Sequence, residues 1–210
     1  VHRATGLAAL NEMLLFRTML MMKPGMEAGD FVYLRGVHEE AWQRLTRIAF
    51  EQEPEKALQR LLDEGADHYL TAYGLDHRVG ERAARSGLPA LSRWAQQLRE
   101  AQRARPGHEP MMCQMRRAAY TRGQARLLFV PCGYDPQRVL LHQGDALWSA
   151  TSGFGRIVAP VQGYERVIRG RDFAALGFHA DSATLTLDCK EGLGSLICAV
   201  LLPSGQSEKI

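Results

Sequence analysis

The sequence has 210 residues, of which 46% are hydrophobic and 23% are charged, and its formal net charge is +3. This composition is typical of a globular protein and excludes intrinsic disorder, a collagen-like repeat and a small disulfide scaffold. No apolar run reaches the roughly 18 residues of a transmembrane helix, so the sequence predicts no membrane span.

The first half of the chain has hydrophobic residues at helical spacing. Residues 7–22 are apolar around nearly the whole circumference of a helix, which predicts a helix enclosed by others. Asn11, Glu12 and Arg17 interrupt this segment and exclude the unbroken apolar centre of a signal peptide. Further helices are predicted over residues 39–51, from Pro54 to a left-handed cap at Gly65, and over residues 67–73, 78–85, 91–101 and 111–121.

The segment 106–110 contains two prolines and a glycine, which interrupt helical propagation. It predicts a boundary between a helical region, residues 1–105, and an antiparallel β-rich region, residues 111–210. The sequence leaves open whether these regions are separate domains or share one core.

After Gly123, β-branched and aromatic residues occur in short runs between turn-forming residues. Because the connections are short, neighbouring strands are expected to be antiparallel, with one helical insertion at residues 172–178. The predicted fold class is α+β, with a helical N-terminal half followed by a mainly antiparallel β-sheet C-terminal half. The predicted strands span residues 126–130, 138–142, 146–150, 157–161, 165–169, 183–187 and 196–202.

Basic residues are concentrated in the middle of the chain. The range Arg99–Arg171 contains twelve arginines, no lysine and five acidic residues, whereas the charges before it nearly cancel. Such a region could attract phosphate, nucleic acid or an acidic protein surface, but the favoured interpretation is a solvated surface on which arginine replaces lysine. The candidate anion- or nucleic-acid-binding residues are Arg116, Arg117, Tyr120, Arg122, Arg126, Arg169 and Arg171.

The four cysteines are scattered and form no C-x-x-C pair, which favours a reducing compartment and a cytoplasmic protein. Cys132 follows one predicted strand and His142 ends the next, so that an imidazole could activate the thiol, with Asp145 orienting the ring. The competing interpretation is that Cys132 packs as a small buried hydrophobic residue. Cys132, His142 and Asp145 are therefore a hypothetical catalytic set.

Neither the histidines nor the methionines indicate a cofactor. The seven histidines lack clustered ligand spacing, so no metal site is expected. All eight methionines fall within residues 13–26 and 111–115. The preferred interpretation of these two groups is core packing. A partner-binding groove is the second interpretation, and a Cu(I) site is the third.

Three classes of function are compatible with these features. The first is a non-catalytic binding or accessory protein (an adaptor, a chaperone-like protein or a regulator) that uses an arginine-rich, methionine-containing surface to bind a protein partner. The second is a nucleic-acid- or nucleotide-binding regulator that acts through Arg99–Arg171. The third is an enzyme with a Cys132/His142 centre. The absence of a complete catalytic motif favours the first class.

Overall fold

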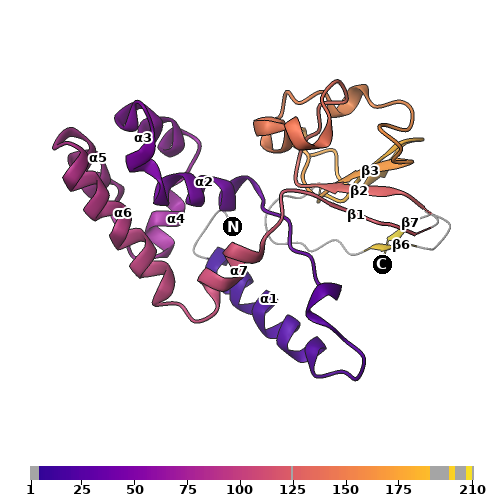
Figure 1. Cartoon of the computed structure of the whole chain (residues 1–210), viewed down its shortest axis with the longest axis horizontal. Coiled ribbons are helices and arrows are strands. Elements are labelled where there is room, and N and C mark those ends of the chain that lie inside the picture. The colour runs from indigo at the N-terminus through magenta and orange to yellow at the C-terminus, as the bar shows by residue number, and fades with distance from the viewer. Residues whose placement is uncertain (1–4, 124, 190–198, 202–206, 210) are drawn as a thin grey trace. The chain divides into compact units, whose positions relative to one another are not determined.

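The computed structural model describes residues 5–123, 125–189, 199–201 and 207–209. Seven helices precede a five-stranded sheet, so the chain has an α+β fold, as the sequence predicted (Figure 1). The chain divides into two compact units. We call Val1–Tyr33 with His38–Met115 the helical unit, and Leu34–Val37 with Arg116–Ile210 the sheet unit.

The helices follow the predicted order along the chain. Local signals explain several of their ends: Pro54 occupies the first turn of α3, Asp76 accepts a hydrogen bond from the Arg78 N–H at the start of α5, and Gly65 has a φ of +92° after α3. The helix predicted over residues 111–121 begins earlier and ends at Gln114, within the helical unit. The helices are α1 (Thr5–Met21), α2 (Val37–Thr46), α3 (Pro54–Asp63), α4 (Asp67–Ala72), α5 (His77–Arg85), α6 (Leu88–Arg103) and α7 (His108–Gln114).

A hydrogen-bonded network runs through the core of the helical unit. The Trp42 indole N–H donates to Gln102 Oε1 at 3.1 Å, and its ring stacks on Tyr73 at 4.4 Å. The Tyr73 hydroxyl lies 2.9 Å from His108 Nδ1, and His108 Nε2 lies 2.9 Å from Asn11 Oδ1. Because Asn11 is on α1 and His108 on α7, this network ties the first helix to the last one.

The sheet has strand order β1-β2-β3-β5-β4 and is mixed. Its three central strands β2, β3 and β5 run parallel, whereas the outer strands β1 and β4 are antiparallel to their neighbours. A second, two-stranded antiparallel sheet pairs β6 with β7. The strands are β1 (Ala119–Tyr120), β2 (Leu127–Val130), β3 (Arg166–Arg169), β4 (His179–Ala180), β5 (Thr184–Thr186), β6 (Ala199–Leu201) and β7 (Ser207–Lys209).

The expectation of antiparallel neighbours was wrong for the sheet centre, because three predicted strands do not form. Residues 140–142 and 144–148 are short 3-10 helices, and residues 157–161 contribute a single bridge between Val161 and Tyr164. These segments join β2 to β3, and their combined length permits a parallel crossover. Residues 172–178, expected to be helical, contain turns instead, and most of the predicted strand 196–202 lies outside the described residues.

Both faces of the central strands are covered by side chains. On β3, Val167 joins one apolar cluster and Ile168 the other, as the alternation of side chains along a strand requires. Leu128 on β2 belongs to the same cluster as Val167, and Leu185 on β5 to the same cluster as Ile168.

In the described part of the chain, no helix combines the length and apolarity needed to cross a bilayer.

Candidate functional site

The parallel strands β2, β3 and β5 all end at one edge of the sheet, which we call the carboxyl edge. The segments 131–134, 170–172 and 187–189 follow these strands there. Ligands of parallel sheets commonly bind at such an edge, because the loops after the strands meet there. The sequence prediction of antiparallel strands could not identify it.

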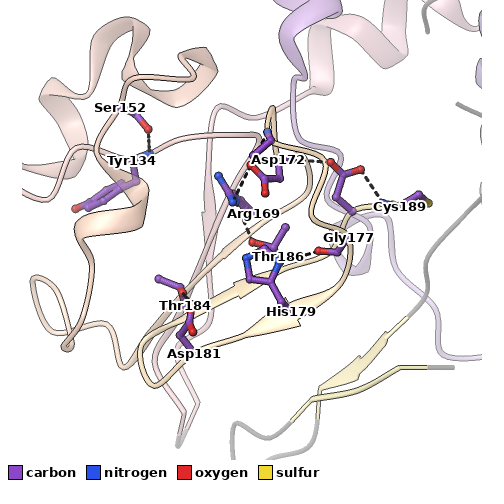
Figure 2. A network of polar contacts seen from close by, with 12 residues as sticks. Tyr134, Ser152, Arg169, Asp172, Gly177, His179, Asp181, Thr184, Thr186 and Cys189 are labelled. Atoms are coloured by element: carbon purple, nitrogen blue, oxygen red, sulfur yellow. Dashed lines mark hydrogen bonds and ion pairs between the residues drawn. The ribbon is translucent and has the colours of Figure 1, made fainter. Parts of the chain in front are cut away.

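Arg169, at the end of β3, is held by three neighbours at the carboxyl edge. Figure 2 shows its contacts with Asp172 and Thr186. Its Nη2 lies 3.0 Å from Asp172 Oδ1, its Nε donates to Thr186 Oγ1 at 2.9 Å, and its guanidinium lies 4.3 Å from the centre of the Phe154 ring. The side chains of Arg169 and Asp172 are 14% and 5% exposed. The charge of Arg169 is therefore compensated within the protein.

Asp172 is also tied to the loop that follows β5. Its backbone N–H donates to Asp188 Oδ2 at 2.7 Å, and Asp172 Oδ1 accepts the Ala174 N–H at 3.0 Å. Asp172 Oδ2 is buried and has no hydrogen-bond partner. Among the described residues, no three His, Cys, Asp or Glu side chains are arranged to hold a metal ion.

The structure places the hypothetical catalytic residues in different environments. Cys132 is 2% exposed in the loop after β2, where its backbone N–H donates to the Leu147 carbonyl at 3.1 Å. His142 and Asp145 are exposed on the short helices Leu140–His142 and Gly144–Trp148. A catalytic role for this set remains a hypothesis.

The opposite edge, where β2 and β3 begin, carries a different group, which we call the tyrosine–arginine cluster: Tyr120, Arg122, Arg126 and Tyr164. The Tyr120 and Tyr164 ring centres lie 6.1 Å apart. The Arg122 guanidinium lies 5.7 Å from the centre of the Tyr120 ring and donates to its hydroxyl at 3.3 Å. This hydrogen bond raises the pKa of Arg122, so its charge is maintained.

The remaining predicted anion-binding residues do not join that cluster. Arg117 lies over the Trp148 ring at 5.3 Å and donates to the Gly144 carbonyl at 3.0 Å. Arg171 lies over the Phe173 ring at 5.5 Å, on the segment that follows β3. Arg116 is exposed, and its carbonyl accepts the Arg35 N–H at 2.8 Å. The structure therefore divides the predicted arginine group between the two edges of the sheet.

The two methionine groups also differ. Met111, Met112 and Met115 are buried in the core of the helical unit, which fits a packing role. On α1 and the residue after it, several large apolar side chains are exposed instead: Met13, Leu15, Phe16, Met19, Met21 and Met22. The prediction of a helix enclosed on all sides was therefore wrong for this part of α1.

Several residues at these sites were not identified from the sequence. Thr186 and Phe154 reach Arg169 only through the tertiary arrangement of the chain, whereas Asp172 follows Arg169 by three residues in the turn after β3. Tyr164 could have been identified from the sequence, because it directly follows the Gln162-Gly163 turn that precedes β3.

Comparison with known proteins gave no matching family model, no similar curated protein and no similar solved structure.

Proposed function

We propose that the protein is a non-catalytic accessory protein that docks α1 into an apolar groove of a partner protein. The observation that supports this proposal is the exposure of Leu15, Phe16, Met19 and Met22, which are 55%, 61%, 59% and 80% exposed. We call these four residues the α1 apolar face. Exposed apolar side chains that gather on one surface are typical of interaction sites.

The spacing of these residues fits helix-in-groove binding. Leu15, Met19 and Met22 stand at positions i, i+4 and i+7, and Phe16 lies next to this row. Anchors at this spacing are how an amphipathic helix fills a hydrophobic groove. Leu7 and Leu10, on another side of α1, are buried in the helical unit, so the helix can keep its own packing while it presents the second face.

Burial of this face would contribute favourable energy to a complex. Fully burying one Leu, Met or Phe side chain contributes about 1.5–3 kcal/mol. Part of this gain offsets the loss of translational and side-chain freedom on association. Methionine suits such a contact because its flexible thioether adapts to the shape of a groove.

Charge on α1 disfavours a parallel pairing of two copies of this chain. Glu12 is exposed one turn before Phe16, on the same side of the helix. Two copies pairing in parallel would bring the two Glu12 carboxylates together, which is unfavourable. A groove with a basic residue near its end would instead pair with Glu12, and this is the partner chemistry that we propose.

The test combines crosslinking with reconstitution. p-Benzoylphenylalanine in place of Phe16 should crosslink one partner in the native cells, and the purified partner should then bind the full chain in calorimetry. Phe16→Ser together with Met19→Ser should abolish the binding heat while leaving the circular dichroism spectrum unchanged. Phe50→Ser is the matched control, since Phe50 is 88% exposed elsewhere in the helical unit and should not affect binding.

The alternative occupants give distinct results in this experiment. A crosslink between two copies together with a dimer in light scattering would replace the proposal by self-association. A crosslink within one chain would show that the sheet unit covers α1. If Phe50→Ser lost as much binding as the Phe16→Ser and Met19→Ser variant, the binding would be nonspecific hydrophobic adhesion. Each of these results rejects the proposed partner.

The cellular compartment is part of the same proposal. The cysteine spacing lacks the pattern of a disulfide scaffold, which supports a reducing compartment such as the cytoplasm.

A further inference from the structure

We propose that the tyrosine–arginine cluster of the sheet unit binds single-stranded nucleic acid, with the tyrosine rings stacking on bases and the arginines contacting phosphates. This inference goes beyond the proposed docking of α1 and depends on different residues. It rests on the exposure of the rings, the availability of the guanidinium charges and the fixed position of Tyr164.

The aromatic part of the cluster is accessible. Tyr120 is 49% exposed on the outer strand β1, and Tyr164 is half-buried beside it, with the two rings inclined at 56°. Aromatic rings on an exposed sheet provide stacking surfaces that accept any base, because every base has a π face. Bases inside a duplex are already stacked, so such rings select single strands.

The arginines of this edge are available for phosphate. Arg122 and Arg126 are exposed, and Arg166 at the start of β3 is half-buried. Within the described ranges, none of these three lies within salt-bridge distance of a carboxylate. Glu165 lies nearby, but its Oε1 accepts the backbone N–H of Arg126 at 3.2 Å. A guanidinium that has no internal counterion can form paired hydrogen bonds with phosphate oxygens.

The backbone holds Tyr164 in place before any ligand binds. Val161 and Tyr164 exchange backbone hydrogen bonds of 3.0 and 2.9 Å across a turn in which Gln162 and Gly163 have positive φ angles of 52° and 82°. The Gln162 amide donates to the Arg138 carbonyl at 2.7 Å and accepts the Leu140 N–H at 3.2 Å. The stacking surface is therefore preorganised, which reduces the entropy lost on binding.

An acidic protein surface fits this cluster less well than a nucleic acid does. A carboxylate partner uses the arginines but gains little from two adjacent aromatic faces. A single strand uses both groups, since its phosphates and bases alternate along the chain. The contribution of the Tyr120 ring therefore distinguishes the two classes of partner.

The experiment measures fluorescence anisotropy of a fluorescein-labelled, mixed-sequence oligonucleotide of about 12 nucleotides with the full chain. The same sequence is tested as single-stranded DNA, single-stranded RNA and duplex. We expect saturable binding of a single strand that weakens as salt rises from about 50 to 200 mM. Tyr120→Leu should weaken binding at least about fivefold, whereas Tyr120→Phe should retain it.

The charge variants complete the test. Arg122→Gln and Arg126→Gln should each weaken binding and reduce the slope of log affinity against log salt by about one. Arg156→Gln is the matched control, because Arg156 is exposed beside Phe154 at the carboxyl edge and should not change affinity. Circular dichroism of every variant verifies that the fold is intact.

Three results would overturn the proposal. The first is no saturable binding of single-stranded DNA or RNA at the lowest salt concentration. The second is unchanged affinity of the Tyr120→Leu variant for the single strand, which would mean that the protein binds any polyanion through its charge alone. The third is tighter binding of the duplex than of either single strand.

Discussion

The two edges of the five-stranded sheet use arginine in opposite ways. At the carboxyl edge, Arg169 contacts Asp172 and Thr186 (Figure 2). Its guanidinium also lies over the Phe154 ring, and its side chain is 14% exposed. At the other edge, Arg122 lies on the exposed ring of Tyr120. A basic region of sequence can therefore contain both structural charges and charges that remain available to a ligand.

This difference follows from what surrounds each strand end. At the carboxyl edge, the turn after β3 supplies a carboxylate, β5 a hydroxyl and the 3-10 helix Phe154–Arg156 an aromatic ring to one guanidinium. The opposite edge has a short turn and an outer strand of two residues, which leave the side chains in water. Substitutions at the two edges test this contrast.

Arg169→Met should lower the free energy of unfolding by about 3 kcal/mol, because it leaves the buried Asp172 carboxylate without its counterion. Urea denaturation measures the change. Arg122→Met, the matched change at the other edge, should stay within about 0.5 kcal/mol of the wild type. If the two variants were equally stable, the contrast between the edges would be wrong.

Gly133→Ala should lower the free energy of unfolding by about 2 kcal/mol, because the added methyl group would overlap Ser152 Oγ and the Ala146 carbonyl. The same methyl group would disturb the hydrogen bond from the Tyr134 N–H to Ser152 Oγ. Gly155→Ala is the control, since nothing lies within 4 Å of its added methyl group. Thermal unfolding that ranks these variants in the reverse order would contradict the close packing at this edge.

The helical unit offers a pH test of a buried polar group. Burial, followed by the charge of Arg105, lowers the pKa of His108 below its usual value of 6.5. Below pH 6.5 the unfolded chain gains a proton that the folded chain does not, so stability should fall as pH decreases from 6.5 towards the folded pKa. Above pH 6.5 the histidine is neutral in both states and this contribution to pH dependence vanishes.

Urea denaturation at several pH values compares the wild type with His108→Gln. The variant should lose part of the decline in stability on acidification, because it removes the group that takes up the proton. An identical decline in both proteins would assign the pH dependence to other residues.

The reactivity of two cysteines tests the burial of the loop after β2. Cys113 is exposed and Cys132 is buried, so iodoacetamide at neutral pH should modify Cys113 completely before Cys132 reacts detectably. Peptide mass spectrometry follows both sites in one sample. Reaction of Cys132 ahead of Cys113 would indicate an activated thiol and would favour the enzyme hypothesis.

The helices could be predicted closely from the sequence, since their signals are local. Pro54, Asp76 and Gly65 determine helix ends through backbone geometry that depends on a few neighbouring residues. Strands in residues 138–150 could not be predicted correctly, because short apolar runs also occur in short 3-10 helices.

The candidate arginines could be predicted from the sequence, but their division between the two edges of the sheet could not. Arg116 and Tyr120 fall within the helix predicted over residues 111–121, yet α7 ends at Gln114 and the chain beyond it leads into β1. Two partners of Arg169, Thr186 and Phe154, are distant in sequence and are brought to it by the topology, whereas Asp172 lies only three residues away. The candidate arginines were therefore predictable, whereas the residues that enclose Arg169 and the geometry of both sites depended on the topology.

The outermost strands β1 and β4 of the five-stranded sheet have two residues each. So short an outer strand gives an incoming chain few backbone groups with which to extend the ladder. This feature limits cross-β growth from the native state, and concentrated solutions should resist fibril formation for as long as the sheet stays folded.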